Sequence, residues 1–125
     1  MPERSAGRTV VVVDNDPDAL DLAALDLRLD GHDVVGTATD GRTAIVLCDA
    51  LHPDVLVVDH RMPPGPWGLE VAVEVVRRRL AGHVILYTNH LDGDLPERAS
   101  AAGATFLAKG DLRSLRRAVR RGPLS

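Results

Sequence analysis

Short apolar runs alternate along the chain with longer segments whose apolar positions recur every three or four residues. Continuous runs rich in valine are typical of strands buried on both faces of a sheet. The longer segments have the period of helices with one buried face. The pattern predicts strands at residues 9–13, 33–38, 55–58, 83–87 and 104–108, and helices at 17–29, 41–51, 69–80, 96–102 and from 112 onward.

Aspartates mark the beginnings of the predicted helices. Asp16 precedes Pro17, which predicts an N-cap followed by proline at the first helical position. Asp111 has the same place before the last helix. Within the first helix we expect Asp18, Asp21 and Asp26 to face solvent, and we expect residues 1–8 to be loosely held.

Strict alternation of strand and helix predicts an α/β fold with a parallel sheet and right-handed crossovers. A chain of 125 residues suggests one domain, residues 1–125. Aromatic residues make up only 2% of the chain, so the core must consist of aliphatic side chains. One cysteine, Cys48, excludes an internal disulfide and fits a cytoplasmic protein. No apolar stretch approaches the roughly 20 residues of a membrane span.

Four predicted strands are each followed by a polar residue that could do chemistry: Asp14, Asp59, Thr88 and Lys109. Because ligands of open parallel sheets bind beyond the carboxyl ends of the strands, we expect these side chains to meet in one crevice. Two carboxylates, a hydroxyl and an ammonium are the equipment for a magnesium ion and a phosphoryl group.

The metal ligands expected in this crevice are hard oxygens. Asp14 and Asp59 would hold Mg²⁺ directly or through water, and Asn15 would add a neutral carbonyl oxygen. The backbone carbonyl near Arg61 would add another. Beside such an ion, Asp59 could attack phosphorus as a nucleophile. Thr88 would donate a hydrogen bond to a phosphoryl oxygen, and Lys109 would pair with the phosphate.

Four segments in this order resemble the receiver domain of two-component response regulators. They are VVVDNDPDAL, PDVLVVDHRMPPGPWGLEV, VILYTNH and GATFLAKGDL, and the resemblance extends over residues 8–121. It implies a flavodoxin-like, doubly wound sheet of five strands in the order 2-1-3-4-5 with five helices.

The resemblance also implies roles for single residues. Asp59 would accept a phosphoryl group from a sensor histidine kinase or phosphotransfer protein, with Mg²⁺ as cofactor. Thr88 and Phe106 would form the switch that reshapes the face of the fourth helix, fifth strand and last helix, where a downstream protein would bind. Arg61 and His90 lie where receivers tune self-dephosphorylation. Such a protein assists its own phosphotransfer but is not an enzyme.

The chain departs from the receiver pattern in ways that favour an alternative. Asn15 replaces a second acid, so we expect weaker magnesium binding unless Asp16, better placed as a helix cap, compensates. Gly110 replaces a proline, and Phe106 lacks the phenol of the common tyrosine. The loop after Asp59 is one residue longer than usual. The alternative is a non-phosphorylated pseudo-receiver that acts as a protein interaction module.

Other features leave two interpretations open. Trp67 either covers the loop after Asp59 or contacts a partner. The arginines of the last helix form either a solvated face or a surface for a homodimer or another protein. They lack interleaved aromatics, which argues against direct nucleic-acid binding. No helix-turn-helix follows Arg121, so we expect no output domain in this chain. The five histidines show no metal-ligand spacing.

Overall fold

Five strands and five helices alternate along residues 7–91 and 93–121, the part of the chain that the computed structural model describes. Within these residues, no helix is both long and apolar enough to cross a membrane. The elements are β1 (Thr9–Val13), α1 (Pro17–Leu29), β2 (Asp33–Ala38), α2 (Gly41–Leu51), β3 (Val55–Val58), α3 (Gly68–Arg78), β4 (His83–Thr88), α4 (Leu95–Ala101), β5 (Thr105–Ala108) and α5 (Leu112–Arg121).

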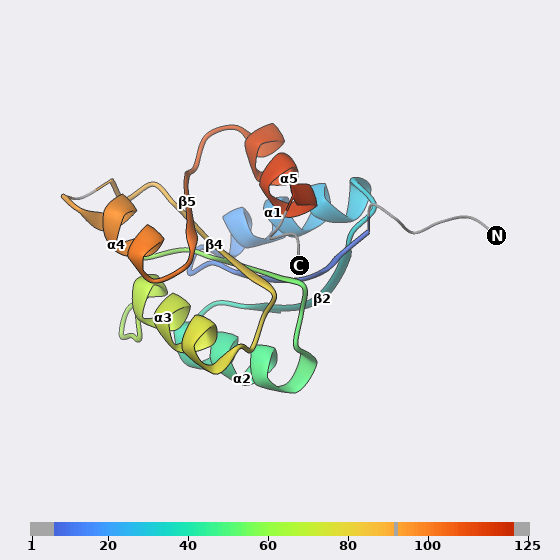
Figure 1. Ribbon diagram of the computed structural model, residues 1–125. Coiled ribbons are helices and arrows are strands. Elements are labelled where there is room, and N and C mark those ends of the chain that lie inside the picture. The colour runs from blue at the N-terminus through green and yellow to red at the C-terminus, as the bar shows by residue number, and fades with distance from the viewer. Residues whose placement is uncertain (1–6, 92, 122–125) are drawn as a thin grey trace.

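The strands form one parallel sheet in the order β2-β1-β3-β4-β5, which confirms the predicted topology. Helices cover both faces of the sheet. Figure 1 shows α1 and α5 on one face, with α2 and α3 on the other. Residues of α4 share the apolar core with α2 and α3. Parallel pairing aligns the carboxyl ends of the central strands, because Val13 of β1 is opposite Val58 of β3.

The valine runs are continuous because each strand packs against helices on both sides. Val11 and Val13 belong to the core with α2, α3 and α4, whereas Val10 and Val12 belong to the core with α1 and α5. Successive side chains of a strand point to opposite faces, so every position must be apolar. Burial of each such side chain stabilises the fold by about 1.5–3 kcal/mol.

The helix boundaries follow local hydrogen bonds. Asp16 caps α1, its Oδ1 accepting the N–H of Asp18 at 3.0 Å. Asp111 accepts the N–H of Arg113 at 2.9 Å at the start of α5. The expectation that the third helix runs to residue 80 is wrong. Helix α3 ends at Arg78, because Arg79 adopts a left-handed backbone conformation with φ of 56°.

Ion pairs join the first helix to the last. Arg116 of α5 donates to Asp26 of α1 at 2.7 Å, and Arg120 donates from Nε to Asp30 at 2.9 Å. The prediction that Asp26 faces solvent is therefore wrong, since its side chain is only 17% exposed. Sequence periodicity places Asp26 beside the apolar stripe but cannot say that a cation lies opposite. Part of the basic face of α5 is thus used inside the fold.

Arg8 is held by α5, contrary to the expectation that residues 1–8 are loose. Its guanidinium donates to the carbonyls of Arg120 and Arg121 at 3.1 and 3.2 Å, a favourable place for a cation at the end of a helix. The rest of that expectation concerns residues 1–6, which lie outside the described residues.

The loop between β3 and α3 returns to pack directly on the end of its own strand. Gly68, the first residue of α3, donates its N–H to the carbonyl of His60 at 2.7 Å. A Cβ atom at position 68 would lie 2.0 Å from the backbone oxygen of Asp59, so only glycine allows this approach. The position of Asp59 therefore depends on Gly68.

We expect Gly68→Ala to lower the free energy of unfolding by about 1–3 kcal/mol, because a backbone atom must move to admit the methyl group. Urea unfolding monitored by circular dichroism measures the change. Gly36→Ala in β2 is the matched control, since its methyl would meet only side-chain methyls of Leu47 and Leu51, at 3.4 Å. Equal losses in both variants would contradict the interpretation.

Candidate functional site

The carboxyl ends of four strands meet around a pocket of about 330 Å³. Asp14 follows β1, Asp59 follows β3, Thr88 ends β4 and Lys109 follows β5. The structure brings these four residues, predicted from the sequence, together in one lining. The full lining consists of Asp14, Asn15, Asp16, Asp59, Arg61, Thr88, Asn89, His90 and Lys109.

Lys109 bridges the two carboxylates. Its Nζ lies 2.5 Å from Oδ2 of Asp14 and 3.2 Å from Oδ2 of Asp59. All three side chains are mostly buried, with exposed fractions of 17% for Lys109, 7% for Asp14 and 14% for Asp59. A cation between two acids in a confined space reduces their repulsion, which is the condition for keeping both charged.

Burial and charge work against each other at this bridge. Burial disfavours the ammonium, but the hydrogen bond and charge of Asp14 and the charge of Asp59 outweigh it and raise the pKa of Lys109. For Asp14, burial raises the pKa, assisted by the charge of Asp59 and opposed by hydrogen bonds from Lys109 and Asp16. Lys109 is therefore cationic at neutral pH, and Asp14 takes up a proton more readily than an exposed aspartate.

The remaining carboxylate oxygens are held by the backbone. Oδ1 of Asp14 accepts the N–H of Asp16 at 2.9 Å, and Oδ1 of Asp59 accepts the N–H of His60 at 2.7 Å. Asp16 lines the pocket, but its own Oδ1 caps α1. It is therefore committed to the helix and is a poor substitute for the acid that Asn15 replaces. The side chain of Asn15 is exposed at the pocket.

The hydroxyl of Thr88 accepts one hydrogen bond and donates none to the described residues. Thr88 is only 1% exposed, and its Oγ1 accepts the N–H of His90 at 3.0 Å. Its backbone carbonyl accepts the N–H of Lys109 at 3.0 Å, which couples the ends of β4 and β5. Asn89, between Thr88 and His90, also lines the pocket and was missed by sequence reasoning. Its position directly after the strand was the available signal.

Next to the pocket, aromatic rings contact Arg61 and His90, which line it. The rings of His60 and Trp67 meet edge to face with centroids 5.4 Å apart, and His60 and His90 lie 6.2 Å apart. The guanidinium of Arg61 lies 5.9 Å from the centre of the Trp67 ring. Trp67 therefore folds back over its own loop. Met62 anchors this loop by complete burial, which the polar and proline-rich sequence around it concealed.

Phe106 lies in β5 opposite Leu86 of β4. It is partly buried and packs against the core shared by α2, α3 and α4. Gly110, which follows Lys109, has a φ of 155°, a conformation that the fixed ring of proline excludes. The strand end at Lys109 is thus built differently from the proline-containing pattern that the sequence departs from.

The donor set fits a magnesium ion with few protein ligands. Among the described residues, no group of three or more histidine, cysteine, aspartate or glutamate side chains is placed to hold a metal. Mg²⁺, however, commonly uses one or two carboxylates and keeps several waters. Asp14 and Asp59 supply two carboxylates that already share one cation, Lys109. Both acids have backbone or amide oxygens nearby in sequence, at Arg61 and Asn15.

Comparison with known families identifies the class of domain. The sequence profile described as the response regulator receiver domain matches residues 10–120. The chain therefore belongs to the receiver domain family of two-component response regulators. Receiver domains are signalling domains that accept phosphoryl groups and generally bind Mg²⁺ in an acidic pocket.

Several regulators are similar to this chain. The transcriptional regulatory protein PdtaR of Mycobacterium tuberculosis is 37% identical over 103 residues, which cover 82% of this chain and 49% of that protein. The probable transcriptional regulatory protein NarL of the same organism is 37% identical over 107 residues, covering 84% and 49%. The chain thus spans about half the length of these curated relatives.

Solved structures agree with the fold. The signal receiver domain of NarL from Mycobacterium tuberculosis superposes with a TM-score of 0.83 at 33% identity, covering 94% of both chains. The response regulator TrrA of Thermotoga maritima, in complex with Mg²⁺ and BeF, has a TM-score of 0.81 at 27% identity and covers 91% of this chain and 97% of that chain.

We expect Lys109→Met to lower the free energy of unfolding at pH 7 by about 1–3 kcal/mol, less than for a fully buried pair because the site is partly open. Stabilisation by a lysine with a raised pKa is present at pH 7 and is lost only as pH rises through that pKa. At pH 4 the deficit should shrink, because protonation of Asp14 relieves the repulsion that the variant leaves behind.

Urea unfolding of both proteins at pH 7 and pH 4 tests this expectation. Arg113→Met is the control, because Arg113 is an exposed cation outside the pocket lining. If the loss in free energy of unfolding caused by Lys109→Met is unchanged or larger at pH 4, Lys109 does not act by reducing the repulsion between the two carboxylates.

Proposed function

We propose that this chain is a phosphorylation-dependent signalling switch in which Asp59 receives a phosphoryl group from a histidine kinase or phosphotransfer protein. The observation that carries the proposal is the position of Lys109, within 3.2 Å of both Asp14 and Asp59 in a pocket that also holds Thr88. Such an arrangement provides a nucleophile, a counter-charge and a donor for one phosphoryl group.

Asp59 is oriented for attack. The N–H of His60 holds one carboxylate oxygen and Lys109 holds the other, while 14% of the side chain stays exposed. In the transfer, an oxygen of Asp59 forms a bond to phosphorus as the bond from phosphorus to the donor imidazole breaks. The electron pair of that bond returns to the imidazole nitrogen. Lys109 then pairs with the incoming phosphoryl oxygens, whose negative charge needs a cation in this buried place.

The metal site follows from the same residues. Asp14 and Asp59 would hold Mg²⁺, with Asn15 and the backbone carbonyl of Arg61 as further oxygen ligands and water completing the shell. When bound, magnesium supplies neutralisation of the phosphoryl oxygens. Asn15 in place of an acid lowers the negative charge available to the ion, so its affinity should be lower than that of a site with three acids.

The response would start at Thr88. Its Oγ1 accepts the N–H of His90, and its hydroxyl hydrogen, which rotates about the C–O bond, could donate to a phosphoryl oxygen. Movement of Thr88 would change the packing of Phe106, which lies on the neighbouring strand β5 and is only partly buried. The face of α4, β5 and α5 would then change its affinity for a downstream protein or for a second copy of the chain.

Self-dephosphorylation would be set by the rim of the pocket. Arg61 and His90 both line it, and the ring of His90 lies near that of His60. Water must pass these side chains to reach an acyl phosphate on Asp59. We infer that residues 1–125 act as one receiver domain.

Incubation with acetyl phosphate should add one phosphoryl group to the wild-type protein only when Mg²⁺ is present. Asp59→Asn should reduce the gain at least tenfold, because the amide is a far weaker nucleophile. Intact-mass spectrometry measures it. Asp16→Asn is the control, since Asp16 lines the pocket but is committed to capping α1. No gain in folded wild-type protein would sink the proposal and favour the pseudo-receiver, to which Asn15 points.

We expect Asn15→Asp to raise the affinity for Mg²⁺ by roughly three- to tenfold, because it adds a carboxylate next to Asp14. Isothermal titration calorimetry with magnesium chloride measures the change. Asn89→Asp adds the same charge to the pocket lining from the β4 side and is the control. An equal gain in both variants would mean that overall charge, not the position of residue 15, limits metal binding.

A further inference from the structure

A second pocket lies at the opposite end of the sheet from Asp59. It has a volume of about 680 Å³, and we call it the basal pocket. It forms because β5 begins at Thr105, opposite Ile85, whereas β4 begins two residues earlier. His83 and Val84 therefore extend beyond the edge strand, and the space beside them is open. Its lining consists of Val76, Arg79, Ala81, Gly82, His83, Val84, Gly103, Thr105, Ala118 and Arg121.

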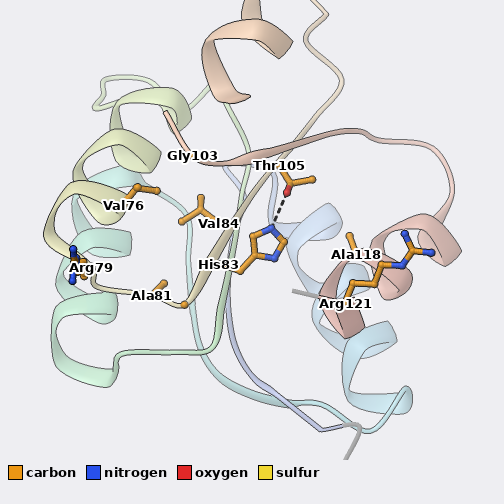
Figure 2. A pocket seen from close by; sticks show the side chains of 10 residues that line it. Val76, Arg79, Ala81, His83, Val84, Gly103, Thr105, Ala118 and Arg121 are labelled. Atoms are coloured by element: carbon orange, nitrogen blue, oxygen red, sulfur yellow. Dashed lines mark hydrogen bonds between the residues drawn. The ribbon is translucent and has the colours of Figure 1, made fainter. Parts of the chain in front are cut away.

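The basal pocket is lined by apolar side chains, with polar side chains at its centre and an arginine on each of two opposite sides. Figure 2 shows Val76, Val84 and Ala118 around the space, with the linked side chains of His83 and Thr105 at its centre. Arg79 from the end of α3 and Arg121 from the end of α5 stand on opposite sides. A ligand here would meet an apolar surface between two guanidinium groups.

Among the described residues that line the basal pocket, the charged side chains are arginines, and none is an aspartate or a glutamate. Within the described part of the chain, neither Arg79 nor Arg121 makes an ion pair, and both are exposed. In Figure 2 the guanidinium of Arg121 points outward, but an exposed, unpaired arginine changes rotamer at little cost. The two arginines are therefore available to an anion.

Only one of the two ring nitrogens of His83 has a hydrogen-bond partner among the described residues. Its Nε2 lies 2.7 Å from the hydroxyl of Thr105. Its Nδ1 is shielded from solvent and has no hydrogen-bond partner among the described residues. Burial lowers the pKa of His83, and the charge of Arg8 lowers it further, so the ring is neutral at pH 7. A buried ring nitrogen without a partner is uncommon and points to a missing polar group.

We propose that the basal pocket binds a small organic anion, a carboxylate or phosphate monoester on a short apolar body. Guanidinium groups recognise both kinds of head group through paired hydrogen bonds. The volume of the pocket falls in the range of roughly 300–1,000 Å³ typical of small-molecule sites. The apolar walls provide the contact area for the body of the ligand, and the absence of acids from the lining removes a source of repulsion.

Sodium octanoate is the first probe, titrated into ¹⁵N-labelled protein. Saturable shifts should concentrate on the amides of Ala81, Gly82, Gly103 and Thr105. Octyl phosphate should bind the same amides if any anionic head group suffices, whereas octylammonium chloride should bind at least tenfold more weakly because the arginines repel it. Tighter binding of one of the two anions identifies the preferred head group.

The double variant Arg79→Gln/Arg121→Gln should weaken octanoate binding roughly tenfold or more. Arg113→Gln/Arg117→Gln removes the same charge from exposed positions of α5 outside the lining and should leave binding unchanged. Ala118→Leu, which fills the pocket, should also weaken binding. Asp59→Asn should not, so this inference and the proposed phosphorylation stand or fall separately.

Three results would overturn the proposal. One is equal binding of octanoate and octylammonium. Another is equal affinity of the two double-arginine variants. The third is the absence of saturable shifts at the basal pocket in folded wild-type protein, whether or not shifts occur elsewhere.

Discussion

The rest of the site depends on the ion pairs that the ammonium of Lys109 makes with two carboxylates. A parallel sheet brings its strand ends to one edge whether or not their side chains are compatible, and here two of the side chains are carboxylates. The Nζ of Lys109 lies 2.5 Å from Asp14 and 3.2 Å from Asp59. Lys109 follows the edge strand β5, whereas the two aspartates follow the inner strands β1 and β3. Ion pairs of this kind contribute little net stability after desolvation. Their larger effect is to make a crowded acidic site tolerable at neutral pH.

The two aspartates that follow β1, Asp14 and Asp16, have different roles. Asp14 faces the pocket, whereas the carboxylate of Asp16 accepts the N–H of Asp18 at the start of α1. Two aspartates two positions apart thus serve the site and the helix separately. With Asn15 in place of an acid, Lys109 is shared by two carboxylates, those of Asp14 and Asp59, and under the proposed function a divalent ion would meet a weaker field. The receiver fold is complete, and in the proposed function Asn15 would lower the affinity of the site for Mg²⁺.

Much of the fold could be predicted from the sequence, because its strongest signals are local. Valine runs buried on both faces, and Asp16 with Pro17 at a helix start, depend on few distant contacts. The strand-end residues Asp14, Asp59, Thr88 and Lys109 could be predicted because parallel topology alone aligns them.

What could not be predicted depends on contacts between distant elements. Asp26 is paired because Arg116, from the last helix, lies opposite. Met62 is buried because its side chain joins the core with α2, α3 and α4, and nothing in the neighbouring prolines indicates this. The basal pocket arises because β4 begins two residues before its pairing with β5, and strand propensity does not encode how two strands pair. The helix end at Arg78 reflects the backbone conformation of a single arginine.

The edge-to-face contact of Trp67 with His60 has a spectroscopic consequence. Trp67 is the only tryptophan of the chain, and His60 directly follows the proposed phospho-acceptor. Nearly all the ultraviolet emission of the protein excited at the red edge of its absorption therefore originates beside the strand end. A shift of the loop by a fraction of an ångström would alter quenching by the imidazole. The intrinsic fluorescence of Trp67 therefore reports on the loop that follows Asp59, without an added dye.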